Sequence, residues 1–161
     1  MKNHILFGLL LAGAFTLISC GDDDNADTSD NQTSADQTTE IAQTGTWRIS
    51  SFIDSGEDET TDFNGYVFTF NTDGSLVAVN GTTTVSGTWS VTDDSSNSST
   101  DDDGNSTDDD DFNIFFPVPE SSDFEDLNDD WDVISVSPTV ISLIDISGGN
   151  GGTDTLTFTQ N

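Results

Sequence analysis

The stretch "YVFTFNTDGSLVAVNGTTTVSGTWSV", residues 66–91, decides the fold class of this chain. Apolar and polar side chains alternate within it, and Phe68 and Phe70 share one parity. A period of two is typical of a strand that buries one face. The turns at Asn71–Gly74 and Asn80–Gly81 place Gly or Asn where a tight hairpin needs a positive φ. The stretch therefore predicts three consecutive antiparallel strands.

The same alternation continues on both sides of this stretch. In the first run Trp47, Ile49 and Ile53 share one parity. Further runs occupy residues 112–118, 131–133, 140–146 and 156–158. About eight strands with mostly short connections predict an all-β domain. An antiparallel meander closes best as a barrel, because closure removes exposed edges, and a two-sheet β-sandwich is the alternative.

Aromatic residues suit the interior of such a barrel. The chain has 11 Phe, and nine of them follow Cys20, which is enough to fill a small barrel largely with rings. We find no convincing start of a longer helix in the strand-forming part. Residues 121–130 predict one short helical turn that presents Phe124 and Leu127 to the core.

The net charge limits the classes of partner. The 161 residues hold 31 acidic and two basic side chains, for a formal net charge of −29. Such a surface repels phosphate backbones and anionic headgroups, so we expect no nucleic-acid partner and no electrostatic docking to membranes. The acids cluster between apolar segments, which indicates one ordered domain with acidic loops.

The N-terminus has the pattern of an export signal. Lys2 precedes an apolar run at residues 5–18, which is shorter than the roughly 20 residues of a membrane-spanning helix. The run ends at Leu17-Ile18-Ser19-Cys20, which resembles the lipobox of bacterial lipoproteins. The resemblance implies that residues 1–19 are removed and that Cys20 carries a diacylglycerol and an amide-linked acyl chain such as palmitate. An ordinary buried cysteine is the alternative, and an intrachain disulfide is excluded because Cys20 is the single cysteine.

The residues after Cys20 predict a location and a tether. Asp22, Asp23 and Asp24 resemble the acidic signal that sends Bacteroidetes lipoproteins to the outer face of the outer membrane. The alternative location is the periplasmic face of that membrane. Residues 20–44 are rich in Asp, Thr, Gln, Ser and Ala, so we expect them to be a disordered acidic tether.

Three tryptophans mark starts of predicted strands. Gly45-Thr46-Trp47 recurs as Gly87-Thr88-Trp89, and Trp131 follows Asp129-Asp130. Together with the Phe-rich strand and the segment Leu127–Val133, this set resembles the lipocalin-like domains of Bacteroidetes lipoproteins over residues 45–161. The resemblance implies a β-barrel with room for a small apolar ligand, and no agreed activity. No basic residue lies near the C-terminus to pack on the first Trp, so a filled interior is the alternative to an open ligand site.

Most catalytic chemistry is excluded by composition. The single His is His4, in the segment expected to be removed, and Lys2 is the single Lys. Nucleophilic Ser-His and Cys-His machinery, Schiff-base chemistry and His/Cys zinc sites are therefore excluded from the mature chain. A paired-carboxylate glycosidase stays open, because carboxylates are abundant. We expect a protein that is not an enzyme.

The acidic run at residues 92–111 is predicted to be an insertion in the hairpin between two strands of one domain. If Gly104 takes the sixth position of an EF-hand loop, Ser99 takes the first and Asp110 the twelfth, where Asp and Glu are required. The flanks are strands rather than helices. The remaining hypothesis is weak calcium binding, with Asp101, Asp103, Asp108 and Asp110 as ligands, and otherwise a solvated loop.

These patterns together predict a monomeric lipoprotein that carries a lipocalin-like domain at residues 45–161. Its membrane partner would be reached through the lipid on Cys20. The favoured function is a non-catalytic binding module for a small apolar molecule or a glycan. The alternatives are a structural or interaction lipoprotein of the envelope with weak calcium binding, and an acidic glycosidase.

Overall fold

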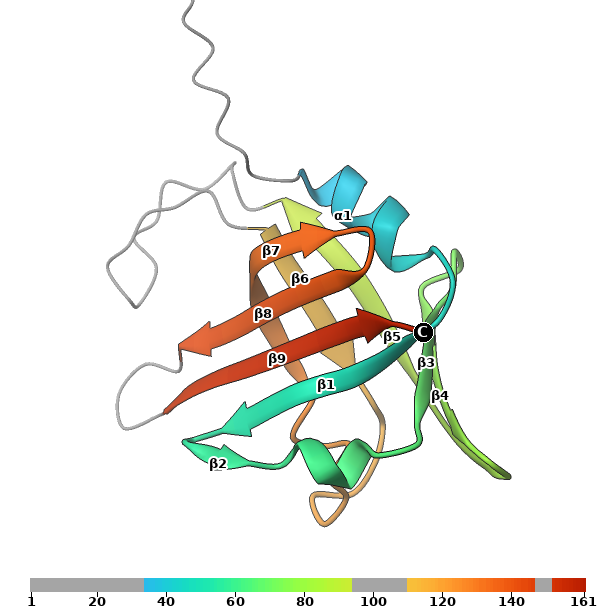
Figure 1. Ribbon diagram of the computed structural model, residues 1–161, viewed down its shortest axis with the longest axis vertical. Coiled ribbons are helices and arrows are strands. Elements are labelled where there is room, and N and C mark those ends of the chain that lie inside the picture. Colours follow the sequence, from blue (N-terminus) through green and yellow to red (C-terminus); the bar gives the residue numbers. More distant parts are fainter. Residues whose placement is uncertain (1–33, 94–109, 147–151) are drawn as a thin grey trace, which may run out of the picture. The chain divides into compact units, whose positions relative to one another are not determined.

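Figure 1 shows the computed structural model, which describes residues 34–93, 110–146 and 152–161. One α-helix, α1 (Ala35–Ala42), precedes the strands, and one 3-10 helix, η1 (Thr60–Phe63), lies between the second and third strands. The strands are β1 (Trp47–Asp54), β2 (Glu57–Asp58), β3 (Val67–Phe70), β4 (Ser75–Asn80), β5 (Thr83–Asp93), β6 (Asp110–Phe115), β7 (Asp129–Ser137), β8 (Val140–Ile146) and β9 (Thr153–Gln160).

The strands form a closed antiparallel barrel. From β3 to β9 each strand pairs with the next, and β9 returns to pair with β1. β2 is a two-residue addition to the end of β1, so eight strands make the wall. β1 and β3 meet at one residue pair, Trp47 with Phe68. The predicted barrel is confirmed, and the sandwich alternative is wrong because β1–β9 pairing closes the sheet.

Aromatic rings fill the interior of the barrel. Phe70 on β3 lies 5.4 Å from Phe112 on β6 and 5.4 Å from Phe158 on β9, measured between ring centroids. Phe68 lies 5.5 Å from Phe158. All three pairs are edge-to-face, the geometry that aromatic quadrupoles favour. The prediction of a Phe-filled interior is confirmed, and it leaves the inside of the wall occupied by the protein's own side chains.

A β-bulge in β1 corrects one detail of the predicted pattern. The register of β1 against β9 shifts between Ile49 and Ser51. After the shift, the fully buried residue is Phe52, while Ile53 is half-buried. One extra residue reverses which parity faces the core. Strict alternation from Trp47 therefore assigns Ile53 wrongly to the inner face.

The prediction that residues 20–44 form a disordered tether is wrong for residues 34–44. Ser34 caps α1 through its Oγ, which accepts a hydrogen bond from the backbone N–H of Gln37. Thr38 and Ala42, one turn apart, are buried, and the indole Nε1 of Trp47 donates to the Ala42 carbonyl oxygen at 2.8 Å. The helix is stabilised by docking onto the domain, which composition cannot indicate. Residues 20–33 lie outside the described part of the chain.

The segment between β6 and β7 forms turns rather than the predicted helical turn. Its backbone N–H groups bond three residues back, from Ser122 to Pro119, from Glu125 to Ser122 and from Asn128 to Glu125. The prediction for its apolar residues is confirmed, because Phe124 and Leu127 are buried in the core. Such successive turns hold the segment compact against the barrel.

The ends of the acidic run join two neighbouring strands. Thr92 pairs with Asp111, and Asp93 pairs with Asp110. The strands therefore include the first two and the last two residues of the predicted insertion at 92–111, and residues 94–109 lie outside the described part. Within the described residues, none of the helices has the length and apolarity needed to cross a bilayer.

Candidate functional site

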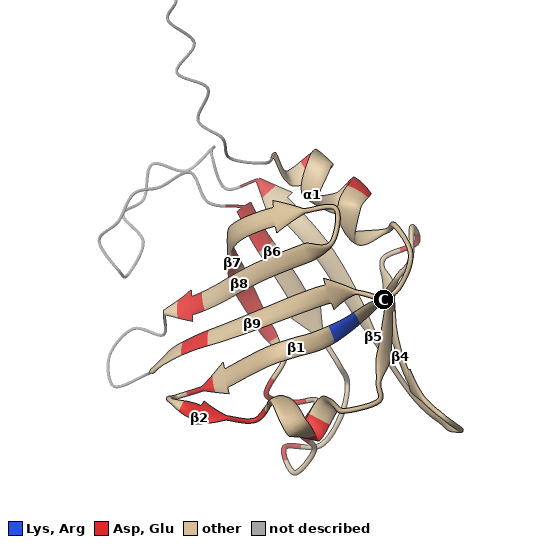
Figure 2. Ribbon diagram, in the orientation of Figure 1, with Lys and Arg blue, Asp and Glu red and all other residues tan. Residues whose placement is uncertain are grey.

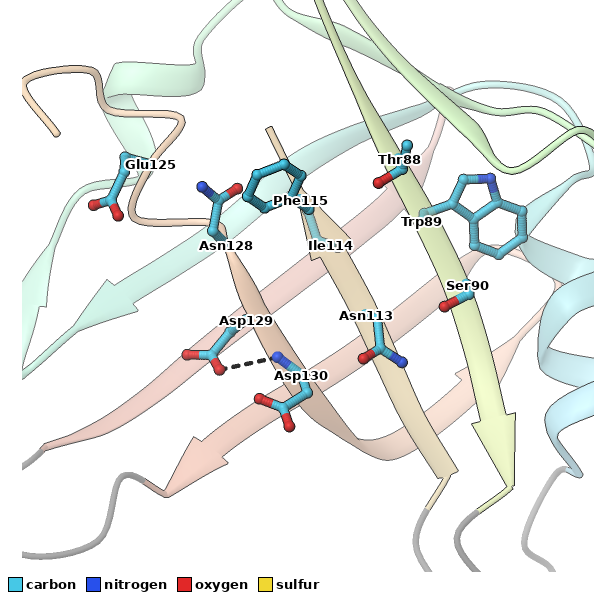
Figure 3. Close-up of a pocket in the computed structure, with 10 residues that line it drawn as sticks. All are labelled: Thr88, Trp89, Ser90, Asn113, Ile114, Phe115, Glu125, Asn128, Asp129 and Asp130. Carbon is cyan, nitrogen blue, oxygen red and sulfur yellow. Dashed lines mark hydrogen bonds between the residues drawn. The ribbon is translucent and has the colours of Figure 1, made fainter. Parts of the chain in front are cut away.

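A cleft of about 630 Å³ lies on the wall of the barrel where β5, β6 and β7 run side by side (Figure 3). This volume is within the range of about 300–1,000 Å³ that is usual for small-molecule sites. The residues that line it come from these strands and from the segment before β7. They are Thr88, Trp89, Ser90, Asn113, Ile114, Phe115, Glu125, Asn128, Asp129 and Asp130.

The strand register brings the polar groups of the cleft together. Ser90 on β5 lies opposite Asn113 on β6, and Asn113 lies opposite Asp130 on β7. Because side chains alternate across a sheet, these three residues share the outer face, while Trp89 and Ile114 are buried on the inner face. Hydroxyl, amide and carboxyl groups thus form one row across three strands.

Phe115 is the aromatic residue of this outer face. Its side chain is 55% exposed, and its cross-strand partner is Thr88. Gly87 permits the close approach of β5 to this residue, because a Cβ at Gly87 would overlap the carbonyl oxygen of Phe115 and come within 2.8 Å of the Phe116 ring. Phe116 is buried, so it anchors the backbone that presents Phe115.

Asn128 fixes the side of the cleft formed by the segment before β7. Its Oδ1 accepts a hydrogen bond from the backbone N–H of Phe116, and its Nδ2 donates to the Phe116 carbonyl oxygen at 3.0 Å. This two-point contact ties the segment to the end of β6. Figure 3 shows Asn128 next to Phe115, and Glu125 lines the same cleft on the far side of Asn128. The cleft is therefore formed before any ligand arrives.

Among the acidic side chains that line the cleft, Asp129 has a strongly raised pKa. Burial, followed by a hydrogen bond with the Asp130 side chain and the nearby charge of Asp145, raises the pKa of Asp129 to about 6. The backbone N–H of Asp130 donates to Asp129 Oδ1 at 2.9 Å, which opposes the rise (Figure 3). At slightly acidic pH, a protonated Asp129 can therefore donate a hydrogen bond.

A second group of carboxylates forms what we call the acidic end, made of Asp54, Glu59, Asp62 and Asp126. Burial raises the pKa of Glu59 and of Asp126, and repulsion from Asp54 is the next cause for both. Figure 2 shows that acidic residues dominate the charged positions and that one basic residue, Arg48 on β1, lies in the described part. The carboxylates of the acidic end therefore repel one another, and no Lys or Arg of the described part is among the causes that act on Glu59 and Asp126.

Comparisons with known proteins give similarity to solved structures and not to sequence families. No family model matches the sequence, and no curated protein matches it. Among solved structures, a DUF4847 family protein from Bacteroides vulgatus is similar, with 20% sequence identity and a TM-score of 0.46. The match covers 76% of this chain and 96% of that one. A similarity at this level carries no argument on function, which must come from the site itself.

The predicted tryptophan and glycine signature is structural. Trp47, Trp89 and Trp131 are buried, and their Nε1 atoms donate to the carbonyl oxygens of Ala42, Asn71 and Leu127. Each indole thus ties a strand to a turn or to the end of α1. Gly45 has a φ of 78°, which favours glycine, at the connection from α1 to β1. The three indoles are therefore parts of the core, and Trp89 also borders the cleft.

The other predicted site residues divide into two groups. Cys20, Asp22, Asp23 and Asp24 lie outside the described part of the chain, as do Asp101, Asp103 and Asp108. Asp110 is described and is buried at the start of β6, where it pairs with Asp93, so it belongs to the barrel wall. In the described residues, no group of three or more His, Cys, Asp or Glu side chains could hold a metal ion.

Sequence patterns missed the cleft itself. The one available signal was Phe115, which is apolar at an outward parity between the inward residues Ile114 and Phe116. Asn128 and Asp129 carry no such signal, because their roles depend on contacts with β6 and β7 that only the folded barrel brings together.

Proposed function

We propose that this chain is a lipid-anchored, non-catalytic binding module whose ligand, a small molecule or a glycan, occupies the outer cleft rather than the barrel interior. The supporting observation is Phe115, an aromatic ring that is 55% exposed beside hydroxyl, amide and carboxyl groups. Inside the barrel, by contrast, aromatic side chains such as Phe70 and Phe158 pack against each other.

This proposal is tested by ligand-observed and protein-observed NMR on the full chain in a zwitterionic, sugar-free detergent. The probes are a fragment set with two arms, polar aromatic molecules and neutral saccharides. We expect at least one arm to shift the resonances of the cleft strands around Ser90, Asn113 and Phe115. If both arms leave these resonances unchanged, the proposed function is wrong.

The anchoring part of the proposal rests on the lipobox-like residues before Cys20 and on the aspartates after it. We expect Cys20→Ala to move the protein from the membrane fraction to the soluble fraction, because several acyl chains on one residue are what holds such a protein stably. Replacement of Asp22, Asp23 and Asp24 by Ala should protect the domain from protease added to intact cells. Membrane retention of Cys20→Ala would refute lipidation, and unchanged protease sensitivity would refute the export signal.

The alternative function is a structural envelope component that binds calcium weakly. The supporting observation is the negative charge of the acidic end, which attracts cations although its described side chains form no coordinating group. Weak extracellular calcium modules bind at about 10⁻⁴ to 10⁻³ M. A thermal-shift titration with CaCl₂ up to about 10 mM, matched against MgCl₂ and against NaCl of equal ionic strength, tests it. A response to calcium no larger than the response to the matched salts would dismiss a specific calcium role.

The glycosidase alternative finds little support in the cleft. Glycoside hydrolysis needs two carboxyl groups about 5–9.5 Å apart. Asp129 and Asp130 are consecutive residues joined by a hydrogen bond from the Asp130 backbone N–H to Asp129 Oδ1, an arrangement that is not specific to a catalytic pair. We expect no release of 4-nitrophenol from 4-nitrophenyl glycosides above the rate of a Phe115→Ala, Asp129→Asn double variant. Release that depends on Asp129 would overturn the non-catalytic proposal.

A further inference from the structure

The outer cleft combines an exposed aromatic ring, Phe115, on which a ligand can stack, with polar side chains around that ring. We call this ring the stacking platform. Phe115 is presented by backbone that is held on two sides, by close packing against Gly87 and by the contact of Asn128 with Phe116. A flat apolar surface that is fixed in place loses little conformational freedom when a ligand covers it. The platform is therefore suited to a ligand with one flat apolar face.

The surroundings of Phe115 argue against a purely apolar ligand. Its cross-strand neighbour is Thr88, and the next outward residues along the two strands are Ser90 and Asn113. Asn113 Nδ2 donates to Thr92 Oγ1 at 3.2 Å and to the Asp111 carbonyl oxygen at 3.3 Å, so its orientation is set. An apolar ligand that covered these groups would bury them without hydrogen bonds, which is costly. The ligand must therefore carry hydrogen-bonding groups around its apolar face.

The charges of the cleft exclude anionic ligands near neutral pH. Every ionisable side chain that lines it is acidic, namely Glu125, Asp129 and Asp130. Asp145, on β8, adds to the negative potential at Asp129. A carboxylated, sulfated or phosphorylated ligand would be repelled, whereas hydroxyl groups can donate to these carboxylates.

From this combination we propose that the cleft binds a neutral saccharide, with the C–H face of one pyranose ring stacked on Phe115 and its hydroxyl groups bonded to the polar side chains around it. A pyranose has the required shape, since one face presents C–H groups and the rim presents hydroxyls. The cleft volume of about 630 Å³ leaves room for neighbouring sugar units. The inference rests on the proposed function and names the class of ligand for the same cleft.

The experiment is a titration of the full chain, again in a sugar-free zwitterionic detergent because glycoside detergents would compete. The probes are neutral mono- to trisaccharides of glucose, galactose, mannose and N-acetylglucosamine, followed by NMR of the Phe115 ring and of the cleft amides. We expect at least one of them to bind and to shift these resonances. Methyl glucuronide, matched to methyl glucoside, should bind more weakly at about pH 7.5.

Variants separate the platform from general stability. Phe115→Ala should weaken saccharide binding by about tenfold or more, whereas Phe115→Tyr should keep affinity within about threefold, because the ring face is retained. The control is Ile134→Ala, on β7, whose side chain is 57% exposed and does not line the cleft. It should leave saccharide binding unchanged. Equal loss in Phe115→Ala and Ile134→Ala would contradict a stacking role.

The titration distinguishes the failure of this inference from that of the proposed function. If polar aromatic fragments shift the cleft resonances while every neutral saccharide leaves them unchanged, the saccharide inference is wrong and the binding cleft stands. If glucosamine binds and the neutral sugars do not, charge rather than stacking selects the ligand, and the inference is also overturned. If neither arm of probes affects the cleft, both proposals fail.

Discussion

Gly87 has the sharpest steric requirement among the described glycines. The Cβ of an alanine there would overlap the carbonyl oxygen of Phe115, which is backbone and cannot rotate away. We expect Gly87→Ala to cost about 1–3 kcal/mol of unfolding free energy, the usual range for overpacking. For a domain of this size, that lowers the melting temperature by roughly 3–10 °C. Thermal unfolding followed by circular dichroism measures the change.

The control for this prediction is Ser86→Ala, at the exposed neighbouring position of β5. It should change the melting temperature by less than about 2 °C, because exposed substitutions seldom exceed 0.5 kcal/mol. A Gly87→Ala protein as stable as Ser86→Ala would mean that β5 and β6 can separate locally. The presentation of Phe115 would then be looser than the packing indicates.

Asp129 makes stability depend on pH in the direction opposite to a salt-bridged carboxylate. Burial raises the pKa of Asp129 to about 6, above its ordinary value of 3.8, so the folded chain holds this proton more tightly than the unfolded chain. Stability therefore falls as pH rises from about 4 to about 6, and the loss persists above that. We expect Asp129→Asn to be more stable than the natural chain at about pH 7.5 and nearly equal to it at about pH 4.

The size of this effect is modest, because Asp129 is partly exposed and screened by solvent. A gain below about 1 kcal/mol is expected at neutral pH. The control is Asp130→Asn, at the exposed neighbouring position, whose gain should be smaller. Urea denaturation at the two pH values measures both variants. A gain of Asp129→Asn that is the same at both pH values would contradict the assigned cause.

At the residue scale, the sequence predicted burial better than it predicted the site. Trp47, Phe68 and Phe158 were found because alternation reports which residues face the core. The cleft was missed because most residues that line it are common polar types. Only the contacts made in the folded barrel show that they form a site. Asn128 looks like any loop asparagine until the barrel places it against the Phe116 backbone.

At the element scale, a buried hydrogen bond ties the end of α1 to β1. The Trp47 indole donates to the Ala42 carbonyl oxygen at the end of the helix, and both residues are fully buried. Trp47→Phe leaves that carbonyl without its donor, which costs about 1–3 kcal/mol. Because an eight-residue helix is not stable alone, we expect its amides to lose protection from hydrogen exchange.

Trp89→Phe is the matched control for this prediction. It also removes an indole hydrogen bond, from Trp89 Nε1 to the Asn71 carbonyl oxygen, but at the hairpin between β3 and β4. Hydrogen exchange followed by mass spectrometry should therefore show faster exchange at residues 35–42 in Trp47→Phe and unchanged exchange there in Trp89→Phe. Equal exchange of α1 in both variants would mean that general destabilisation, and not the Ala42 contact, controls the helix.

Separation along the chain explains why the elements were predicted unevenly. The strands and their turns were predicted because hairpin pairing is local, as between Thr69 and Val77. The helix and the bulge after Ile49 were missed because each depends on a distant partner. For α1 the partners are β5 and β7, and for the bulge the partner is β9, about a hundred residues further along the chain.

At the scale of the whole molecule, uncompensated negative charge should dominate the solution behaviour. The formal net charge is −29, and burial with mutual repulsion raises the pKa of both Glu59 and Asp126. Salt shortens the range of this repulsion, to about 3 Å at 1 M from about 30 Å at 0.01 M. Added NaCl should therefore raise the melting temperature at about pH 7.5.

The pH dependence of the salt effect identifies its source. As pH falls towards about 4.5, Asp129, Asp126 and Glu59 take up protons before the unfolded chain does, so the folded state loses repulsion first. The stabilisation by NaCl should be several-fold smaller at about pH 4.5 than at about pH 7.5. An Asp126→Asn variant should show part of this reduction already at neutral pH, whereas Asp36→Asn, on the exposed side of α1, should not. A salt effect of equal size at both pH values would assign it to apolar burial rather than to charge, because salting-out of apolar surface does not require ionised carboxylates.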